Sequence, residues 1–365
     1  MSTLFLPGAA LLAGELRRAG LTVHTGPFTE LGVYSVDTED PRLDDVLQRW
    51  RAAQGPRTVL LAAPRSFCAG VERAIDIVEA ALTRFPHPIY VRKQIVHNVH
   101  VVRDLSARGA VFVDELDEVP DGAVVIFSAH GVAPSVRTDA TARELHVIDA
   151  TCPLVTKVHS EVRRFSHRDR QIYLIGHAGH EESVGTLGEA PEDTVLVETV
   201  EDVARLPETD RPQSYVMQTT LAIDEAAEVV DALRARFPTI EGPGTDDICY
   251  ATTNRQNAVR AIAADADVIF VVGSANSSNS VRLAELGIRE GTPTRLVEDV
   301  GDIPLADLAT ARTVGLTAGA SAAPALVEEI VRELRALGPL DVVERRTTEE
   351  TVTFNLPREL EGTGR

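Results

Sequence analysis

Short apolar runs of strand length alternate with segments of helical spacing along most of the chain. The strand-like runs are residues 59–61, 124–127, 172–175, 216–217 and 268–272. Between residues 71 and 82, apolar side chains recur three and four positions apart, as they do on one face of a helix. This alternation predicts an α/β protein with largely parallel sheets.

Three cysteines divide the chain into domain-sized lengths. Cys68, Cys152 and Cys249 lie 84 and 97 residues apart, and each directly precedes a candidate helix with a basic residue near its start. An odd and sparse cysteine count gives no disulfide framework, so the thiols indicate a reducing compartment and a role in metal binding, catalysis or packing.

Polar residues follow each cysteine at a nearly constant distance. His97, His180 and Ser277 come 29, 28 and 28 residues after the three cysteines, each after an apolar strand. A third strand in each repeat again ends in imidazole or hydroxyl groups, which are those of His130, Thr219 and Ser321. Ligands of α/β sheets gather at the carboxyl ends of strands. The repeats therefore predict three similar α/β domains in a pseudo-threefold, trefoil-like arrangement around a shared pocket.

The expected domain boundaries follow from these repeats. They are an N-terminal extension (1–56), three α/β domains (57–152, 153–245 and 246–333) and a C-terminal tail that packs back on the core (334–365). The extension contains a predicted helix at 9–19, a short strand at 21–24 and a second helix at 43–53. The simplest interpretation is a small subdomain packed on the core, and a role in oligomerisation or partner docking stays open.

Composition and charge exclude several functions. Lys and Arg number 36 against 55 Asp and Glu, a formal charge of -19, and only 16 residues are aromatic, so we expect no nucleic-acid partner.

The apolar stretch at 5–14 has no preceding basic residue and is followed by Glu15, Arg17 and Arg18, unlike a signal peptide. No apolar run is long enough to cross a membrane. We expect a cytoplasmic protein, and no nicotinamide or ATP fingerprint is present.

Candidate chemistry centres on the cysteines and the polar strand ends. Each thiol alone is compatible with a buried core residue, with zinc or with an iron–sulfur cluster, but no C-x-x-C pair typical of structural zinc occurs. Three thiols would leave the fourth iron of a cubane cluster open to substrate.

The imidazole, hydroxyl and amide groups at the strand ends suit a diphosphate. The loop at 177–182 lacks the H-E-x-x-H spacing of zinc enzymes, and a carboxylic acid there is a candidate proton donor.

Several segments together resemble 4-hydroxy-3-methylbut-2-enyl diphosphate reductases, the LytB/IspH family. The resemblance runs in order from about residue 57 to about residue 360. It is carried by S-F-C-A-G-V (66–71), V-H-N (96–98), F-S-A-H-G-V (127–132), D-A-T-C-P-L-V-T-K-V-H (149–159), I-C-Y-A-T-T-N-R-Q (248–256) and S-S-N-S (277–280).

The resemblance implies a role for each matching residue. Cys68, Cys152 and Cys249 would ligate a [4Fe–4S] cluster whose fourth iron has no cysteine. The family's diphosphate-binding positions match His97, His130, Ser277, Ser278, Asn279 and Ser321. His180 and Thr219 match positions near the allylic alcohol, and Glu182 matches the proton donor. The family usually has Pro before this Glu, whereas Glu181 stands here.

The implied reaction is a reductive dehydration. The substrate hydroxyl binds the open iron, two electrons are added, the oxygen leaves as water, and protonation gives isopentenyl or dimethylallyl diphosphate. Without a nicotinamide site, the electrons would come from a ferredoxin or flavodoxin. Two alternatives stay open: a nonredox iron–sulfur hydro-lyase, and a redox-sensing or structural metal-binding protein.

Overall fold

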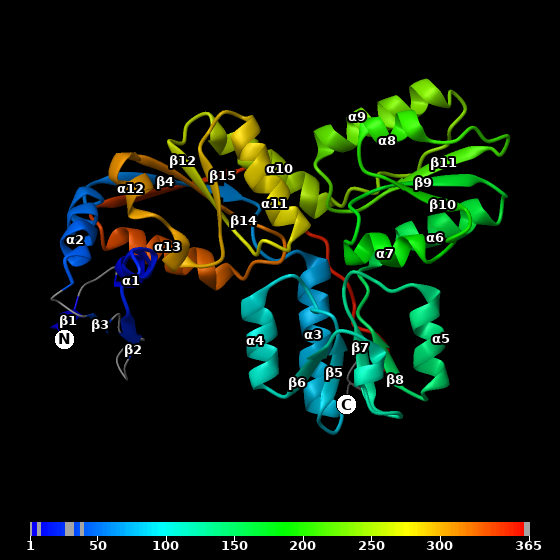
Figure 1. Ribbon diagram of the computed structural model, residues 1–365, viewed down its shortest axis with the longest axis horizontal. Helices are drawn as coiled ribbons and strands as arrows, with labels where there is room; N and C mark the ends of the chain where they lie inside the picture. Colours follow the sequence, from blue (N-terminus) through cyan, green and yellow to red (C-terminus); the bar gives the residue numbers. More distant parts are fainter. Residues whose placement is uncertain (1, 6–8, 26–32, 37–39, 361–365) are drawn as a thin grey trace. The chain divides into compact units, whose positions relative to one another are not determined.

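The computed structural model describes residues 2–5, 9–25, 33–36 and 40–360 (Figure 1). The chain forms two compact units. Unit 1 comprises Met1–Phe67 and Asn254–Glu350, and unit 2 comprises Cys68–Thr253 and Thr351–Arg365. Both contain parallel sheets covered by helices, which confirms the predicted α/β class. Cys68, Cys152 and Cys249 all lie in unit 2, whereas the S-S-N-S segment (277–280) lies in unit 1.

Unit 1 is built on a five-stranded sheet in which every neighbouring pair is parallel, in the order β13-β12-β14-β4-β15. Its strands are β4 (Arg57–Ala63), β12 (Val268–Val272), β13 (Thr294–Val297), β14 (Thr313–Ala318) and β15 (Leu340–Arg346). Its helices are α1 (Ala9–Arg18), α2 (Arg42–Ala52), α11 (Ser278–Arg289), α12 (Leu305–Thr310), α13 (Pro324–Arg335), the 3₁₀ turn η3 (Val300–Asp302) and most of α10 (Tyr250–Ala263).

Both faces of this sheet are covered, so its interior strand β12 is apolar at every position. Along β12, Ile269 and Val271 pack with residues of α10 and α11, whereas Phe270 and Val272 pack with residues of α1, α2, α12 and α13. Successive side chains of a strand point to opposite faces, and a doubly covered parallel strand therefore reads as a continuous apolar run.

The N-terminal extension belongs to the core of unit 1. The predicted helices at 9–19 and 43–53 correspond to α1 and α2, and the predicted strand overlaps β2 (Val23–Thr25). Leu11 and Trp50 are buried in the same cluster as Leu308. The carboxylate of Glu15 lies 2.7 Å from both Arg18 and Arg49, and it also accepts a hydrogen bond from the backbone of Leu305. A small antiparallel sheet, β1 (Ser2–Phe5), β3 (Val33–Val36) and β2, completes the extension.

Because Gly14 has no side chain, the backbone of α1 lies close to the backbone of η3. A Cβ atom on Gly14 would lie 2.0 Å from the carbonyl oxygen of Gly301, which is backbone and has little freedom to move. We expect Gly14→Ala to lower the free energy of unfolding by about 1–3 kcal/mol, measured by denaturant unfolding. Gly244→Ala is the matched control, because no atom lies within 4 Å of that Cβ position. Equal stability of the two variants would contradict close packing of the extension.

Unit 2 contains two separate parallel sheets, in the orders β6-β5-β7-β8 and β10-β9-β11. The first comprises β5 (Ile89–Arg92), β6 (Ala110–Val113), β7 (Val124–Phe127) and β8 (His146–Asp149), and the second comprises β9 (Gln171–Ile175), β10 (Thr194–Val197) and β11 (Gln213–Met217). The helices are α3 (Ala69–Arg84), α4 (Val99–Ala107), α5 (Pro134–Ala142), α6 (Pro153–Ser166), α7 (Glu181–Leu187), α8 (Val200–Arg205) and α9 (Ile223–Arg236), with the 3₁₀ turn η2 (Leu116–Glu118).

The three sheets confirm the internal repeat. In each, a central strand (β5, β9 or β12) pairs on one side with the next strand in sequence and on the other with the one after it. The central strands are preceded by α3, α6 and α10, the helices that follow the three cysteines. The predicted polar positions therefore follow the carboxyl ends of equivalent strands.

The strand pairing differs from the expected domain boundaries at one segment, residues 57–63. Residues 57–63 were placed in the first α/β domain, but β4 pairs with β14 in the sheet of the third repeat. Residues 340–346 of the tail form β15, which pairs along the whole length of β4. The remaining boundaries stay a prediction.

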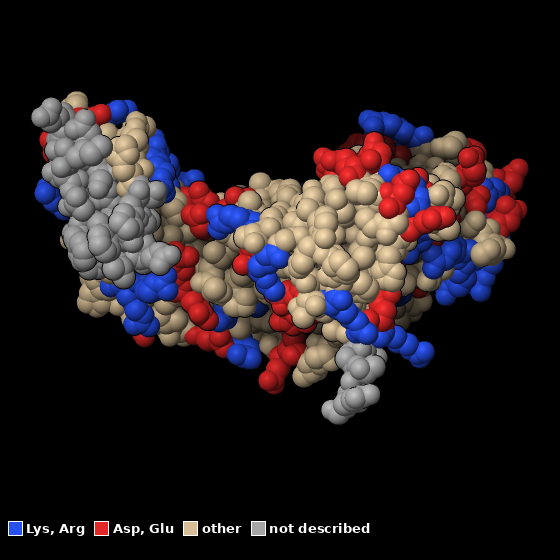
Figure 2. Space-filling model, turned by 90° about the horizontal axis from the view of Figure 1, so that it is seen from below, with Lys and Arg blue, Asp and Glu red and all other residues tan. Residues whose placement is uncertain are grey.

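No helix within the described residues is long and apolar enough to cross a membrane. On the face of the molecule shown in Figure 2, basic side chains are interspersed with acidic ones.

Candidate functional site

Each cysteine belongs to unit 2 and lies at the N-terminal end of a helix. Cys68 is the N-cap residue of α3 and Cys152 that of α6, and Cys249 directly precedes α10. The unpaired N–H groups at a helix start carry partial positive charge, which favours the thiolate over the thiol. The three positions therefore suit thiolate ligands.

A glycine leaves room for two of the sulfurs. A Cβ atom on Gly70, in the first turn of α3, would lie 2.7 Å from Sγ of Cys152 and 3.9 Å from Sγ of Cys68. The absence of a side chain at Gly70 therefore lets the sulfur of Cys152 approach the first turn of α3, near the sulfur of Cys68. Any larger residue here would displace the Cys152 sulfur from this position.

Burial favours the protonated form of two of the thiols, those of Cys152 and Cys249, when no cation is bound. It raises the pKa of Cys152 to about 12, and the charges of Cys68 and Cys249 add to the rise. It also raises the pKa of Cys249 to about 11, with a further contribution from Cys68. A positively charged iron core would compensate both costs, so the three residues fit an iron–sulfur cluster.

None of the three cysteines, all of which are described, forms a disulfide. Among the described residues, no three Cys, His, Asp or Glu side chains lie close enough together to hold a single metal ion. The cysteines of a cubane cluster bind different irons, so such a cluster does not require its ligands to converge on one point.

Three histidines from three strand ends meet in unit 2. The ring of His97, after β5, stacks on that of His130, after β7, with 4.1 Å between centroids. The ring of His180, after β9, lies edge-on to both, at 5.6 and 5.9 Å. The structure thus brings together three residues that the sequence predicted as one group.

The rings of His97 and His180 are held as neutral hydrogen-bonding groups. Burial lowers the pKa of His97 to about 2, and the charges of His130 and His180 contribute. Burial likewise lowers the pKa of His180 to about 3, with contributions from His130 and His177. A polyanion bound beside these rings would favour their protonated forms, and its binding would therefore take up protons.

Glu182 is a buried carboxyl group held in a fixed orientation. It lies in the first turn of α7 and is 2% exposed. Its Oε1 accepts a hydrogen bond from the backbone N–H of Thr219 at 2.6 Å, and its Oε2 accepts one from the Thr219 hydroxyl at 2.9 Å. His180 caps the same helix, because its Nδ1 accepts from the backbone N–H of Glu182.

Burial makes Glu182 the stronger acid–base candidate of the two adjacent glutamates. Burial raises its pKa, although the hydrogen bonds from Thr219 oppose the rise. The carboxylate of Glu181 is more exposed, and its Oε2 lies 3.4 Å from Nδ1 of His130. A carboxyl group with a raised pKa keeps its proton closer to neutral pH, as a general acid requires.

A second group of predicted residues gathers in unit 1. Ser277 caps α11 after β12, and its Oγ lies 3.2 Å from Oγ of Ser321, which follows β14. Ser280 donates its hydroxyl hydrogen to the same Ser277 oxygen at 3.0 Å. Two glycines permit this packing, since Cβ atoms on Gly273 and Gly319 would lie within 2.2 Å of Oγ of Ser280.

Asn279 supplies the clearest sign of a ligand in unit 1. Its side chain is 4% exposed, and both Nδ2 and Oδ1 are buried without a hydrogen-bond partner. A buried amide without partners costs free energy, which a bound polar ligand would recover. Ser278 lies beside it in the first turn of α11, where backbone N–H groups favour an anion.

Sequence reasoning missed several supporting residues. Gln218 accepts hydrogen bonds from the His177 backbone and the Ser183 hydroxyl, so it fixes the loop between β9 and α7. Thr252 contacts the sulfur of Cys249. The sequence offers one signal for each: Gln218 directly precedes Thr219, and Thr252 lies one helical turn after a cysteine.

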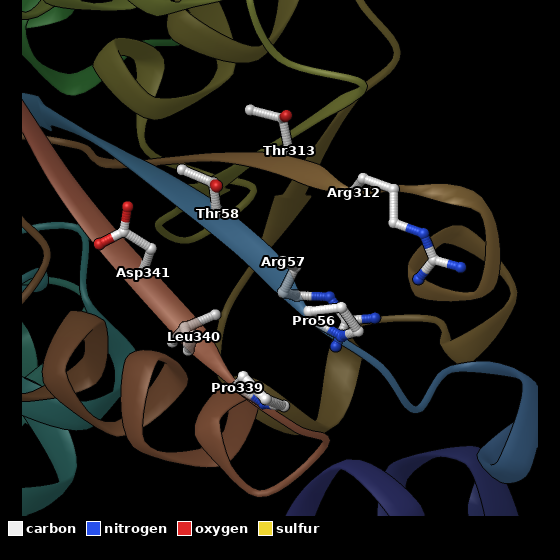
Figure 3. A pocket seen from close by; sticks show the side chains of 8 residues that line it. All are labelled: Pro56, Arg57, Thr58, Arg312, Thr313, Pro339, Leu340 and Asp341. Carbon is white, nitrogen blue, oxygen red and sulfur yellow. The ribbon is translucent and has the colours of Figure 1, made fainter.

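A separate cavity of about 520 Å³ lies at the opposite end of the unit 1 sheet (Figure 3). It is lined by the first residues of β4, β14 and β15 and contains none of the predicted site residues. There the guanidinium of Arg57 donates to the carbonyls of Ala53 and Leu308, which ties the extension to α12.

Comparison with known proteins agrees with this geometry. The model of the LytB protein family matches residues 59–335. The chain belongs to the LytB family. A 4-hydroxy-3-methylbut-2-enyl diphosphate reductase of Mycobacterium tuberculosis is 56% identical over 313 residues, covering 84% of this chain and 95% of the relative. The enzyme of the same name from Cronobacter sakazakii is 55% identical over 306 residues, covering 83% and 97%.

Solved structures show the same fold. The (E)-1-hydroxy-2-methyl-but-2-enyl-4-diphosphate reductase of Plasmodium falciparum has a TM-score of 0.81 and 39% identity, covering 84% of this LytB chain and 97% of its own. A second structure, of an (E)-4-hydroxy-3-methyl-but-2-enyl diphosphate reductase described as the terminal enzyme of the non-mevalonate pathway, has a TM-score of 0.57 and 29% identity, covering 76% and 99%. LytB proteins carry an iron–sulfur cluster.

Proposed function

We propose that this LytB chain reduces (E)-4-hydroxy-3-methylbut-2-enyl diphosphate to isopentenyl and dimethylallyl diphosphate. The reaction consumes two electrons and two protons, breaks the allylic C–O bond and releases the oxygen as water. The observation that carries the proposal is the presence, within unit 2, of three cysteines that each directly precede a helix, together with a buried carboxyl group held by Thr219. The names of the relatives support the substrate.

The proposed cofactor is a [4Fe–4S] cluster held by Cys68, Cys152 and Cys249. Such a cluster, when bound, supplies electrons one at a time and an iron that lacks a cysteine ligand. The fit rests on the approach of the Cys152 and Cys68 sulfurs at Gly70, and on the pKa values of Cys152 and Cys249, which burial raises and an iron core would lower.

Two groups of residues are proposed to bind the diphosphate. In unit 2 these are His97 and His130, whose rings are stacked and half-buried. In unit 1 the proposed residues are Ser277, Ser278, Asn279 and Ser321. Hydroxyl, amide and imidazole groups bind phosphate oxygens through N–H and O–H donors without a fixed charge, so an otherwise acidic protein still accommodates the anion.

The allylic alcohol end of the substrate is proposed to meet His180, Thr219 and Glu182. Thr219 orients both oxygens of Glu182, and burial keeps a proton on this carboxyl group at higher pH than usual. The leaving oxygen and the allylic carbon each require one proton, and Glu182 is suited to deliver a proton to this end of the substrate. His180 holds the first turn of α7, and with it the backbone of Glu182.

Electrons are proposed to come from a ferredoxin or flavodoxin. No nicotinamide-binding fingerprint occurs in the sequence, so the reductant must dock from outside. Such carriers are commonly acidic, and a formal charge of -19 requires that docking use local arginines rather than the bulk charge.

Asn279 gives a direct test of the diphosphate site. We expect Asn279→Ala to raise KM for the substrate about tenfold or more, because a hydrogen bond to a charged group contributes about 1.5–3 kcal/mol. Iron content should stay at the wild-type value. Asn257→Ala, which removes an exposed asparagine of the same unit, is the control. An unchanged KM in Asn279→Ala would remove this residue from the site.

The activity itself is tested with protein purified and reconstituted without oxygen. Reductant-dependent conversion of the hydroxy diphosphate to both products supports the proposal. Loss of water without consumption of electrons would indicate a hydro-lyase instead. A cluster that changes redox state but converts no substrate would indicate a sensor or structural protein.

A further inference from the structure

Thr252 makes a contact that the proposed reaction does not use. It lies three residues after Cys249 in the first turn of α10 and is fully buried. Its Oγ1 lies 3.1 Å from Sγ of Cys249, and its backbone N–H donates to the same sulfur at 3.3 Å. The side chain and the backbone of one residue thus both face one proposed ligand sulfur.

The direction of the hydroxyl hydrogen bond follows from the state of the sulfur. In a free thiol either the sulfur or the Thr252 hydroxyl is able to donate. A sulfur that binds iron has no proton, so it is only an acceptor. The Thr252 hydroxyl must then donate to Sγ.

A hydrogen bond to a ligand sulfur alters the cluster's electron affinity. The sulfur carries more negative charge when the cluster is reduced, so a donor stabilises the reduced state more than the oxidised state. Because Thr252 is shielded from water, solvent does not replace this donor when it is removed.

We infer that Thr252 is a positioning residue that raises the reduction potential of the bound cluster through the sulfur of Cys249. The inference rests on the proposed ligation by Cys249. It assigns to Thr252 no contact with the substrate, and it concerns the one-electron couple of the cluster.

A second threonine provides a matched control. Thr156 lies four residues after Cys152, in the first turn of α6. It is exposed, and its hydroxyl donates to the backbone carbonyl of Cys152 at 3.2 Å rather than to the sulfur. The two threonines share residue type and position near a cysteine, but only the Thr252 hydroxyl is placed against a sulfur.

The experiment is a redox titration followed by electron paramagnetic resonance, on full-length protein reconstituted without oxygen. We expect Thr252→Val, which removes the hydroxyl at nearly constant volume, to weaken the one-electron reduction about tenfold, a potential lower by about 59 mV. Thr252→Ser should restore the wild-type potential, and Thr156→Val should leave it unchanged. Iron and sulfide content are measured for every variant.

Each outcome decides the inference. A wild-type potential in Thr252→Val overturns it, and so does an equal shift in Thr156→Val. If Thr252→Val and Thr252→Ala both lose the cluster while Thr252→Ser keeps it, the hydroxyl serves cluster assembly and the inference is again overturned. The titration needs no substrate, so a wild-type protein that fails to convert the hydroxy diphosphate would contradict the proposed function and leave this comparison intact.

Discussion

Replacing Glu182 with Gln is expected to lower kcat by about 10²–10⁴-fold while iron content stays unchanged. Gln has nearly the same shape and retains an oxygen that accepts one of the two hydrogen bonds from Thr219. It does not release a proton, so the loss reports proton delivery rather than folding. Single-turnover kinetics with a chemical reductant measures the chemical step apart from docking of the electron donor.

The pH dependence of the wild-type enzyme gives an independent check. Burial raises the pKa of Glu182, so its protonated form persists to higher pH than in an ordinary glutamate. If this form is the acid, kcat is highest below the raised pKa and falls as the pH increases through it. Glu182→Gln should remove this limb from the profile.

Glu181→Gln is the matched control for this prediction. It changes the neighbouring carboxyl group, which lies beside His130 and is more exposed. We expect a much smaller effect on kcat. A larger loss in Glu181→Gln than in Glu182→Gln would transfer the proton-donor role to Glu181.

Replacing Cys152 with Ser is expected to reduce bound iron to a small fraction of the wild-type content and to abolish activity. A serine hydroxyl is a weaker ligand for iron than a thiolate, and its N-cap position on α6 would still favour the helix. The change therefore removes a ligand with little harm to α6. Iron and acid-labile sulfide analysis, with the visible absorption of the cluster, measures the result.

Thr156→Val serves as the control for the cysteine variant, since it changes an exposed residue in the same helical turn. It should retain iron at the wild-type amount. Full cluster occupancy in Cys152→Ser would refute its assignment as a ligand.

The repeat and the polar strand ends could be predicted from sequence because both depend on local spacing. A strand, a helix and a second strand occupy a nearly constant length, so His97, His180 and Ser277 recur 28 or 29 residues after a cysteine. The two helices of the extension were predictable for the same reason, since their apolar stripe lies within a short window.

Other features depend on contacts between distant parts of the chain. The pairing of β4 with β14 joins residues about 250 positions apart, and nothing in the apolar run at 59–61 distinguishes this sheet from the next one. Likewise, the sequence shows a threonine after Cys249 and another after Cys152. Only the structure shows that one hydroxyl meets a sulfur and the other a carbonyl.

The position of the three cysteines at helix starts also bears on how the stability of the folded protein depends on iron. Three cysteines at helix starts, two of them with pKa values that burial raises, form a proposed site whose buried thiolates would be compensated by bound iron. Anything that binds the folded state stabilises it by mass action. If the proposed cluster binds here, it would stabilise the folded state, and loss of iron would lower the free energy of unfolding as well as the activity.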